Sequence, residues 1–210
     1  MKHTNLLGIG NSKLRKTAKE LDVKILNFSL PAYKSQSGKI TCPFAKSCVK
    51  FCYAKKGNYL YSNVQKGLER RYAASKDKSF ESDITAQLAG LKTDKQIYIR
   101  IHDSGDFYSF AYITKWFNIA IVNPNVRFYA YTKSISLFKQ INEYLPENFD
   151  LIYSEGSKND KMINKDIDRH ASIFTNEVDL IEAGYTNASY NDLLATKWYN
   201  ANNKIGLIFH

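Results

Sequence analysis

Short apolar and β-branched runs alternate with longer amphipathic stretches along most of the chain. The runs predict strands at 24–29, 96–101, 126–131, 150–154, 171–174 and 204–209. The amphipathic stretches predict helices near 62–75, 79–91, 109–122, 135–144, 163–170 and 177–183. This alternation indicates an α/β fold, in which a mostly parallel sheet carries its helices on the outside. We expect an incomplete (β/α)6-like barrel, with an open sheet as the alternative.

The length of 210 residues predicts a single domain spanning 1–210, since no repeat or linker divides the sequence. A chain of this size buries a core without disulfide or metal support. No run approaches 18 apolar residues, and the first residues lack the apolar segment of a signal peptide. We therefore expect a cytoplasmic protein with no membrane partner.

The chain carries 30 Lys and Arg against 20 Asp and Glu, which gives a formal charge of +10. A charge of this size favours a polyanionic partner, above all nucleic acid. The alternative is a general compositional bias towards Lys, Asn, Ile and Tyr. The basic residues form no dense block, so both interpretations stay open, and the sequence does not indicate the oligomeric state.

Three cysteines, Cys42, Cys48 and Cys52, lie in a predicted loop at about 41–54, with the spacing C-x5-C-x3-C. In a reducing compartment such a group predicts metal ligands or reactive thiols rather than disulfides. Three thiolates can hold a [4Fe-4S] cluster with one open iron, or a [3Fe-4S] cluster. A structural zinc site takes four ligands and would need the distant His102. Three free buried thiols are the remaining alternative.

Polar residues follow three of the predicted strands, where parallel sheets place their sites. They are His102, Asp103, Ser104, Gly105 and Asp106 after the second strand, Tyr131 and Lys133 after the third, and Ser154 and Glu155 after the fourth. Because these ends meet at one edge of a parallel sheet, we expect the nine residues to line one cavity beside the cysteine loop. The alternative is that Asp106 caps the next helix and Asp103 forms a turn.

Within this group we expect different roles. The candidates for catalysis are Asp103, Ser104, Asp106, Lys133 and Glu155, and the candidates for cofactor binding are His102, Gly105, Tyr131 and Ser154. His102 is interpreted either as a fourth ligand or proton donor, or as an ordinary hydrogen-bonded histidine. Arg100 is expected to point into the barrel, where it needs an acidic partner such as Glu155 or Asp103.

Several motifs occur in a fixed order: Asn-Phe-Ser-Leu-Pro-Ala at 27–32, the cysteine loop ending in Cys-Tyr-Ala, Arg-Ile-His-Asp-Ser-Gly-Asp-Phe-Tyr at 100–108, and Phe-Tyr-Ala-Tyr-Thr-Lys-Ser at 128–134. Together with residues 204–210, they resemble the bacteriophage "gene product 88" family over roughly 20–210. The layout is also distantly similar to a shortened radical-SAM enzyme.

The radical-SAM resemblance implies a [4Fe-4S] cluster whose open iron binds S-adenosylmethionine (SAM). It also implies that Ser104, Gly105 and Asp106 stand where those enzymes bind the methionine amino group. The sequence differs from that superfamily in its cysteine spacing, which is usually C-x3-C-x2-C, and in lacking a later glycine-rich motif.

Three functions follow as hypotheses. The first is an iron–sulfur protein of a phage or mobile element, whose open iron binds a small-molecule ligand such as SAM; whether it is an enzyme stays open. The second is a basic, nucleic-acid-binding replication-accessory protein with a structural cluster or zinc, supported by the charge and the 14% aromatic content. The third is a zinc-stabilised interaction protein.

Overall fold

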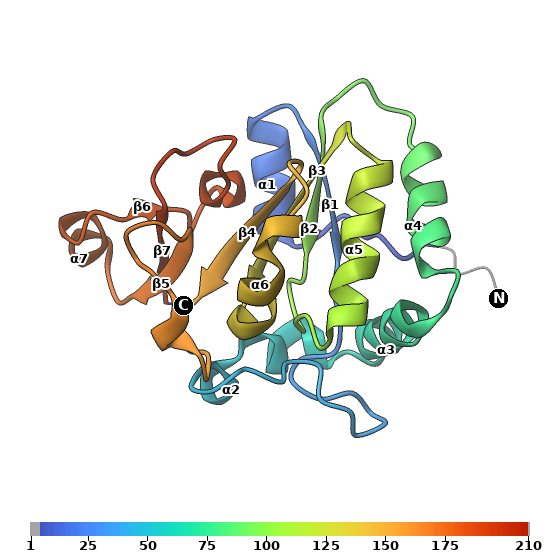
Figure 1. Ribbon diagram of the computed structural model, residues 1–210, viewed down its shortest axis with the longest axis horizontal. Coiled ribbons are helices and arrows are strands. Elements are labelled where there is room, and N and C mark those ends of the chain that lie inside the picture. Colours follow the sequence, from blue (N-terminus) through green and yellow to red (C-terminus); the bar gives the residue numbers. More distant parts are fainter. Residues whose placement is uncertain (1–4, 210) are drawn as a thin grey trace.

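The computed structural model describes residues 5–209, and its centre is a seven-stranded sheet in the order β1-β2-β3-β4-β5-β7-β6. All neighbouring strands are parallel. The strands are β1 (Lys24–Phe28), β2 (Ile97–Ile101), β3 (Val126–Thr132), β4 (Phe149–Ser154), β5 (His170–Phe174), β6 (Thr186–Asn187) and β7 (Lys204–Ile208). The sheet curls into a half-barrel with helices around it, which confirms the predicted α/β fold (Figure 1).

Seven α-helices occur in the described residues. They are α1 (Ser12–Glu20), α2 (Cys48–Phe51), α3 (Ser62–Lys76), α4 (Phe80–Ala89), α5 (Phe110–Val122), α6 (Ile135–Ile141) and α7 (Glu177–Glu182). Short 3-10 turns lie at Tyr53–Lys55, Gly57–Leu60, Asn142–Tyr144, Asp160–Met162 and Asp192–Ala195. None of the helices in residues 5–209 has the length and apolar character needed to cross a membrane.

Helices α3 to α6 cover one face of the sheet (Figure 1). The apolar stripe of α5 packs inward, with Ile113 and Trp116 fully buried. The Trp116 ring contacts the ring of Phe28 from β1, with centroids 5.2 Å apart. A fully buried side chain of this size contributes about 1.5–3 kcal/mol through the hydrophobic effect. This aromatic core fixes the strands whose ends carry the candidate site.

The opposite face of the sheet carries a smaller apolar cluster and the buried charges described below. Helix α1 begins at an Asn11 cap, whose side chain accepts a 3.0 Å hydrogen bond from the backbone N–H of Leu14. Leu14 is buried against this face together with Tyr98 and Tyr129. The 3-10 turn Asp192–Ala195 covers the same face beside α1.

The predicted helix at 163–170 is wrong. Turns occupy 165–167, the residues around them have no helical structure, and β5 begins at His170. The backbone N–H of Asn164 donates to the Asp168 carboxylate at 2.7 Å, and that of Asp166 donates to the Asn164 side chain at 3.1 Å. Such local side-chain bonds compete with helix formation. Helices α1 and α2 and the two-residue strand β6 were not predicted from the sequence.

Candidate functional site

The cysteine loop lies across the carboxyl ends of the strands, where Figure 1 shows α2 beneath the sheet. Two later segments hold it there. The backbone N–H of Asp106, after β2, donates to the carbonyl of Thr41 at 3.0 Å. The N–H of Lys46 donates to the carbonyl of Gly156, after β4, at 2.9 Å. The loop is therefore built onto the edge at which we expected the site.

All three cysteines are free and partly buried. Burial raises the pKa of the Cys42 thiol to about 12, and the charges of Asp106 and of the other two cysteines add to the rise. Burial also raises the pKa of Cys48, whereas the ammonium of Lys133 opposes this shift. The three thiols therefore lie close enough to influence one another, beside two of the predicted strand-end residues.

Gly156 lets the backbone approach the second cysteine. Its φ of 94° lies in the region that favours glycine, and an added Cβ would lie 3.6 Å from Cβ of Cys48 and 3.0 Å from Oγ of Ser47. A glycine at the end of β4 thus makes room for the turn that carries Cys48.

Across residues 5–209, no group of three His, Cys, Asp or Glu side chains that could hold a metal ion is found. A mononuclear zinc needs all its ligands around one point. A polynuclear cluster instead spreads its thiolates over separate iron atoms. Residues 5–209 therefore hold no preassembled set of ligands for a zinc ion.

His102 lies in the aromatic core beneath α5. Its ring is 4.7 Å from that of Phe107, and its Nε2 is 2.9 Å from the hydroxyl of Tyr112. Burial, helped by the charge of Arg100, lowers its pKa to about 3, so the ring is neutral. The structure places His102 as a hydrogen-bonded core histidine, which leaves the zinc interpretation without its fourth ligand.

Asp106 joins the ends of two strands. Its carboxylate accepts hydrogen bonds from the N–H of Phe107 at 2.7 Å, the hydroxyl of Thr132 at 2.6 Å and the N–H of Lys133 at 2.8 Å. Burial raises its pKa, and these bonds oppose the rise. The suggested role as a helix cap is wrong, since Ser109 accepts from the N–H of Tyr112 and caps α5.

Ser104 and Gly105 fasten β2 to β1. The hydroxyl of Ser104 donates to the carbonyl of Leu30 at 2.7 Å, and the N–H of Leu30 donates to the carbonyl of Ser104 at 2.9 Å. Gly105 has a φ of 80°, and an added Cβ would lie 2.5 Å from Cβ of Leu30. Both residues hold the edge of the sheet together.

Lys133 and Ser154 lie together at the ends of β3 and β4. The Lys133 ammonium donates to the Ser154 hydroxyl and to the Glu155 carbonyl, both at 2.7 Å. The Glu155 carboxylate pairs with Lys165. Burial alone would raise the pKa of Glu155, but Lys165 and Ser172 outweigh it and lower the pKa. Glu155 is not the partner of Arg100.

A charged network crosses the inner face beside the site. Arg100 pairs with Asp192, and its Nε lies 3.7 Å from Oδ1 of Asp103, so the expected Asp103 partner is confirmed. Lys13 and the hydroxyl of Tyr129 also contact Asp192, each at 2.7 Å. Although burial opposes ionisation of Asp192, Arg100 and Lys13 hold its pKa below the ordinary value.

This network leaves buried polar atoms without hydrogen bonds. Among them are Nε of Arg100, Oδ1 of Asp103 and the hydroxyl of Tyr131. The Tyr131 ring lies 4.6 Å from the Arg100 guanidinium. Buried groups of this kind are normally satisfied. Tyr53 connects the network to the cysteine loop, because its hydroxyl donates to the Asp103 carbonyl. These atoms therefore keep unused hydrogen-bonding capacity beside the loop.

Sequence reasoning missed Asp192, Tyr53 and Lys13. Asp192 is 92 residues away from Arg100 in the chain, and nothing in its local sequence marks it as buried. Tyr53 could have been found from the sequence, because it directly follows Cys52. Only the paired strands and the position of α1 bring these side chains together.

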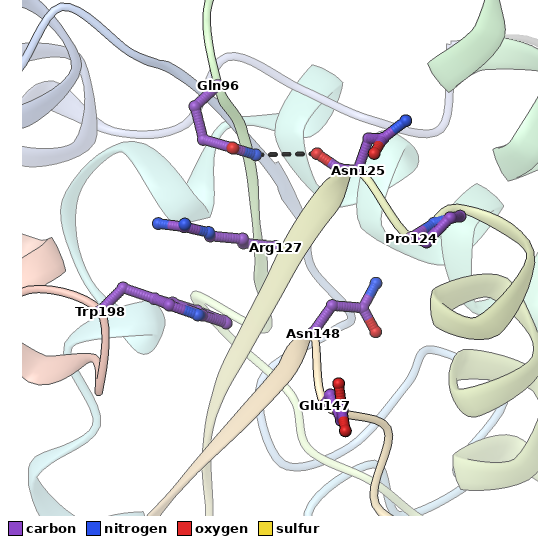
Figure 2. Close-up of a pocket in the computed structure, with 7 residues that line it drawn as sticks. All are labelled: Gln96, Pro124, Asn125, Arg127, Glu147, Asn148 and Trp198. Carbon is purple, nitrogen blue, oxygen red and sulfur yellow. Dashed lines mark hydrogen bonds between the residues drawn. The ribbon is translucent and has the colours of Figure 1, made fainter.

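A separate hollow of about 340 Å³ lies at the opposite edge of the sheet. Figure 2 shows its lining residues, which are Gln96, Pro124, Asn125, Arg127, Glu147, Asn148 and Trp198. The Asn148 amide donates to the carbonyls of Ala120 and Val126, both at 2.9 Å. The polar side chains here connect the strand starts, and the candidate residues lie elsewhere.

The sequence profile described as Gene product 88 matches residues 4–205. A protein named Gene 88 protein, from Mycobacterium phage L5, is 27% identical over 128 residues, which covers 57% of this chain and 54% of that protein. The chain thus spans about half the length of that relative. No solved structure matches the present chain significantly. Because the profile covers nearly the whole sequence, the chain belongs to the Gene product 88 family.

Proposed function

We propose that this protein binds one iron–sulfur cluster, [4Fe-4S] or [3Fe-4S], through Cys42, Cys48 and Cys52. The observation that carries the proposal is the presence of three free, partly buried thiols within eleven residues of one loop. The loop rests on the ends of β2 and β4, which limits its freedom.

The surroundings suit an anionic cluster. Metal binding requires thiolates, so assembly releases the protons that burial now holds on Cys42 and Cys48. The Lys133 ammonium lies close enough to Cys48 to favour its thiolate. Assembly should therefore become more favourable as the pH rises.

The same proposal includes a ligand on the open iron. A cubane held by three cysteines has one iron without a protein thiolate, and that iron supplies the coordination site when the cluster is bound. SAM is the ligand that the radical-SAM resemblance suggests, with radical or redox chemistry as the activity. The unsatisfied atoms of Arg100, Asp103 and Tyr131 can hydrogen-bond the polar groups of such a ligand.

Anaerobic reconstitution with ferrous iron and sulfide tests the cluster. We expect four irons for every four sulfides on the protein if the cluster is [4Fe-4S], or three for every four if it is [3Fe-4S]. Either cluster should give broad visible charge-transfer absorption and an EPR signal after reduction or oxidation. Cys42→Ser, Cys48→Ser and Cys52→Ser should each lose most of these signals. Ser47→Ala, a change in the same loop, should keep them.

A protein that takes up stoichiometric zinc but no sulfide would contradict the cluster. The ligand is tested separately, by recording the EPR spectrum with and without SAM. A changed spectrum supports a ligand on the open iron, and an unchanged spectrum removes SAM while leaving the cluster standing.

A further inference from the structure

The positive charge of the chain is concentrated around the cysteine loop. Residues 23–68 contain eight lysines and no Asp or Glu, and two of the lysines, Lys55 and Lys56, are adjacent. In the structure much of this segment forms the loops across the carboxyl edge of the sheet (Figure 1). Four exposed lysines, Lys46, Lys50, Lys55 and Lys56, lie within ten residues of a cysteine. This edge therefore attracts anions.

Exposed aromatic rings lie among these lysines. Phe51 is 61% exposed and Tyr61 is 60% exposed. Phe209, after β7, is 53% exposed, and its ring lies 6.3 Å from that of Phe51 in an edge-on arrangement. Burying such rings would be favourable, so their exposure beside lysines indicates a surface that contacts a partner.

We propose that this loop surface, formed by the four lysines with Phe51, Tyr61 and Phe209, binds single-stranded nucleic acid. Lysines neutralise phosphates, and exposed aromatic rings stack on unpaired bases regardless of sequence. In a duplex the base faces are already stacked on each other, so duplex binding would use the lysines alone. Single strands use both features of the surface.

An acidic protein is the other class of partner that the charge could attract. It would depend on the same lysines, but the aromatic rings would not meet nucleobases. The inference stands apart from the cluster, because the cysteines are not among the surface residues. Binding should therefore survive in Cys42→Ser.

The test measures fluorescence anisotropy of a labelled oligothymidine of about 20 nucleotides, a length that spans one to a few sites of this type. We expect the oligothymidine to bind more tightly than the matching duplex. The logarithm of its binding constant should fall linearly with the logarithm of the salt concentration. Phe51→Ala should weaken single-strand binding about tenfold or more. Lys50→Ala/Lys55→Ala should make the salt dependence less steep.

The matched controls are Tyr144→Ala, which removes a ring that is 66% exposed elsewhere, and Lys19→Ala/Lys92→Ala, which removes two exposed lysines outside the surface. They should bind like the unchanged protein, and circular dichroism checks that every variant is folded. Absence of binding at low salt overturns the proposal. A second result would also overturn it: the protein binds oligothymidine and polyglutamate equally well, and Phe51→Ala changes neither affinity. That result would indicate an acidic protein as the partner.

Discussion

The backbone N–H of Lys133 donates a 2.8 Å hydrogen bond to the buried carboxylate of Asp106, and so fastens the end of β3 to the end of β2. In Asp106→Asn, an amide group replaces one acceptor oxygen and leaves a buried backbone donor unsatisfied. We expect a loss of about 1–3 kcal/mol in the free energy of unfolding. Urea denaturation measures this loss.

The exposed Asp166 provides the control for this change. Asp166→Asn should alter the free energy of unfolding by less than about 0.5 kcal/mol. Equal stability of the two variants would show that the carboxylate of Asp106 does not hold the strand ends together.

A glycine can be required by a positive φ or by lack of space for a side chain, and a comparison of Gly105 with Gly184 separates these two effects. Both have a positive φ, 80° and 77°, but only Gly105 has a near neighbour, since an added Cβ at Gly184 meets no atom within 4 Å. Gly184→Ala should cost about 1–2 kcal/mol for the backbone alone. Gly105→Ala should cost about 1–3 kcal/mol more because of overpacking against Leu30. Similar melting curves for the two variants would contradict the close contact.

The ion pair of Arg100 and Asp192 predicts a difference between breaking and replacing it. Arg100→Met leaves the fully buried Asp192 without its main partner and should destabilise the fold by about 3–5 kcal/mol. The double change Arg100→Met/Asp192→Leu removes both charges, while Lys13, whose side chain is 26% exposed, can turn to water. The double variant should be the more stable of the two in denaturant titration. The reverse order would show that Asp192 is satisfied without Arg100.

His102 predicts a pH dependence of stability. Its pKa falls from 6.5 to about 3 on folding, so the unfolded chain takes up a proton that the folded chain excludes. Stability present at neutral pH is therefore lost as the pH falls below 6.5, by about 2 kcal/mol at pH 5. His102→Asn should lose less between pH 7 and 5, and asparagine tolerates the positive φ of this position. Parallel curves for the two proteins would contradict a buried neutral histidine.

Much of the fold follows from the sequence because parallel strands are short apolar runs that local pattern reveals. All six predicted strands are present, and the stripe on α5 packs as expected. The exceptions are segments whose structure depends on distant contacts. Strand β6 has two residues and pairs only with β7, so it has too few positions to show an alternation.

The sequence predicts where the candidate site lies, but it predicts less well what each side chain does there. The rule that sites lie at the carboxyl ends of parallel strands puts Asp103, Asp106 and Lys133 beside the cysteine loop, as the structure does. The sequence does not reveal that the hydrogen bonds of Asp106 are taken up by neighbouring protein groups. It also does not reveal which way the ring of His102 turns, since side-chain direction at a strand end depends on the local φ.

The bonds that hold the cysteine loop also constrain when the loop can take its shape during synthesis. Its partners Asp106 and Gly156 follow the last cysteine by many residues, so they leave the ribosome well after Cys52. Until β4 and the turn after it have emerged and docked, the three thiols belong to an unanchored segment. The nascent chain therefore completes most of its sheet before the three thiols form the ordered set that the proposed cluster requires.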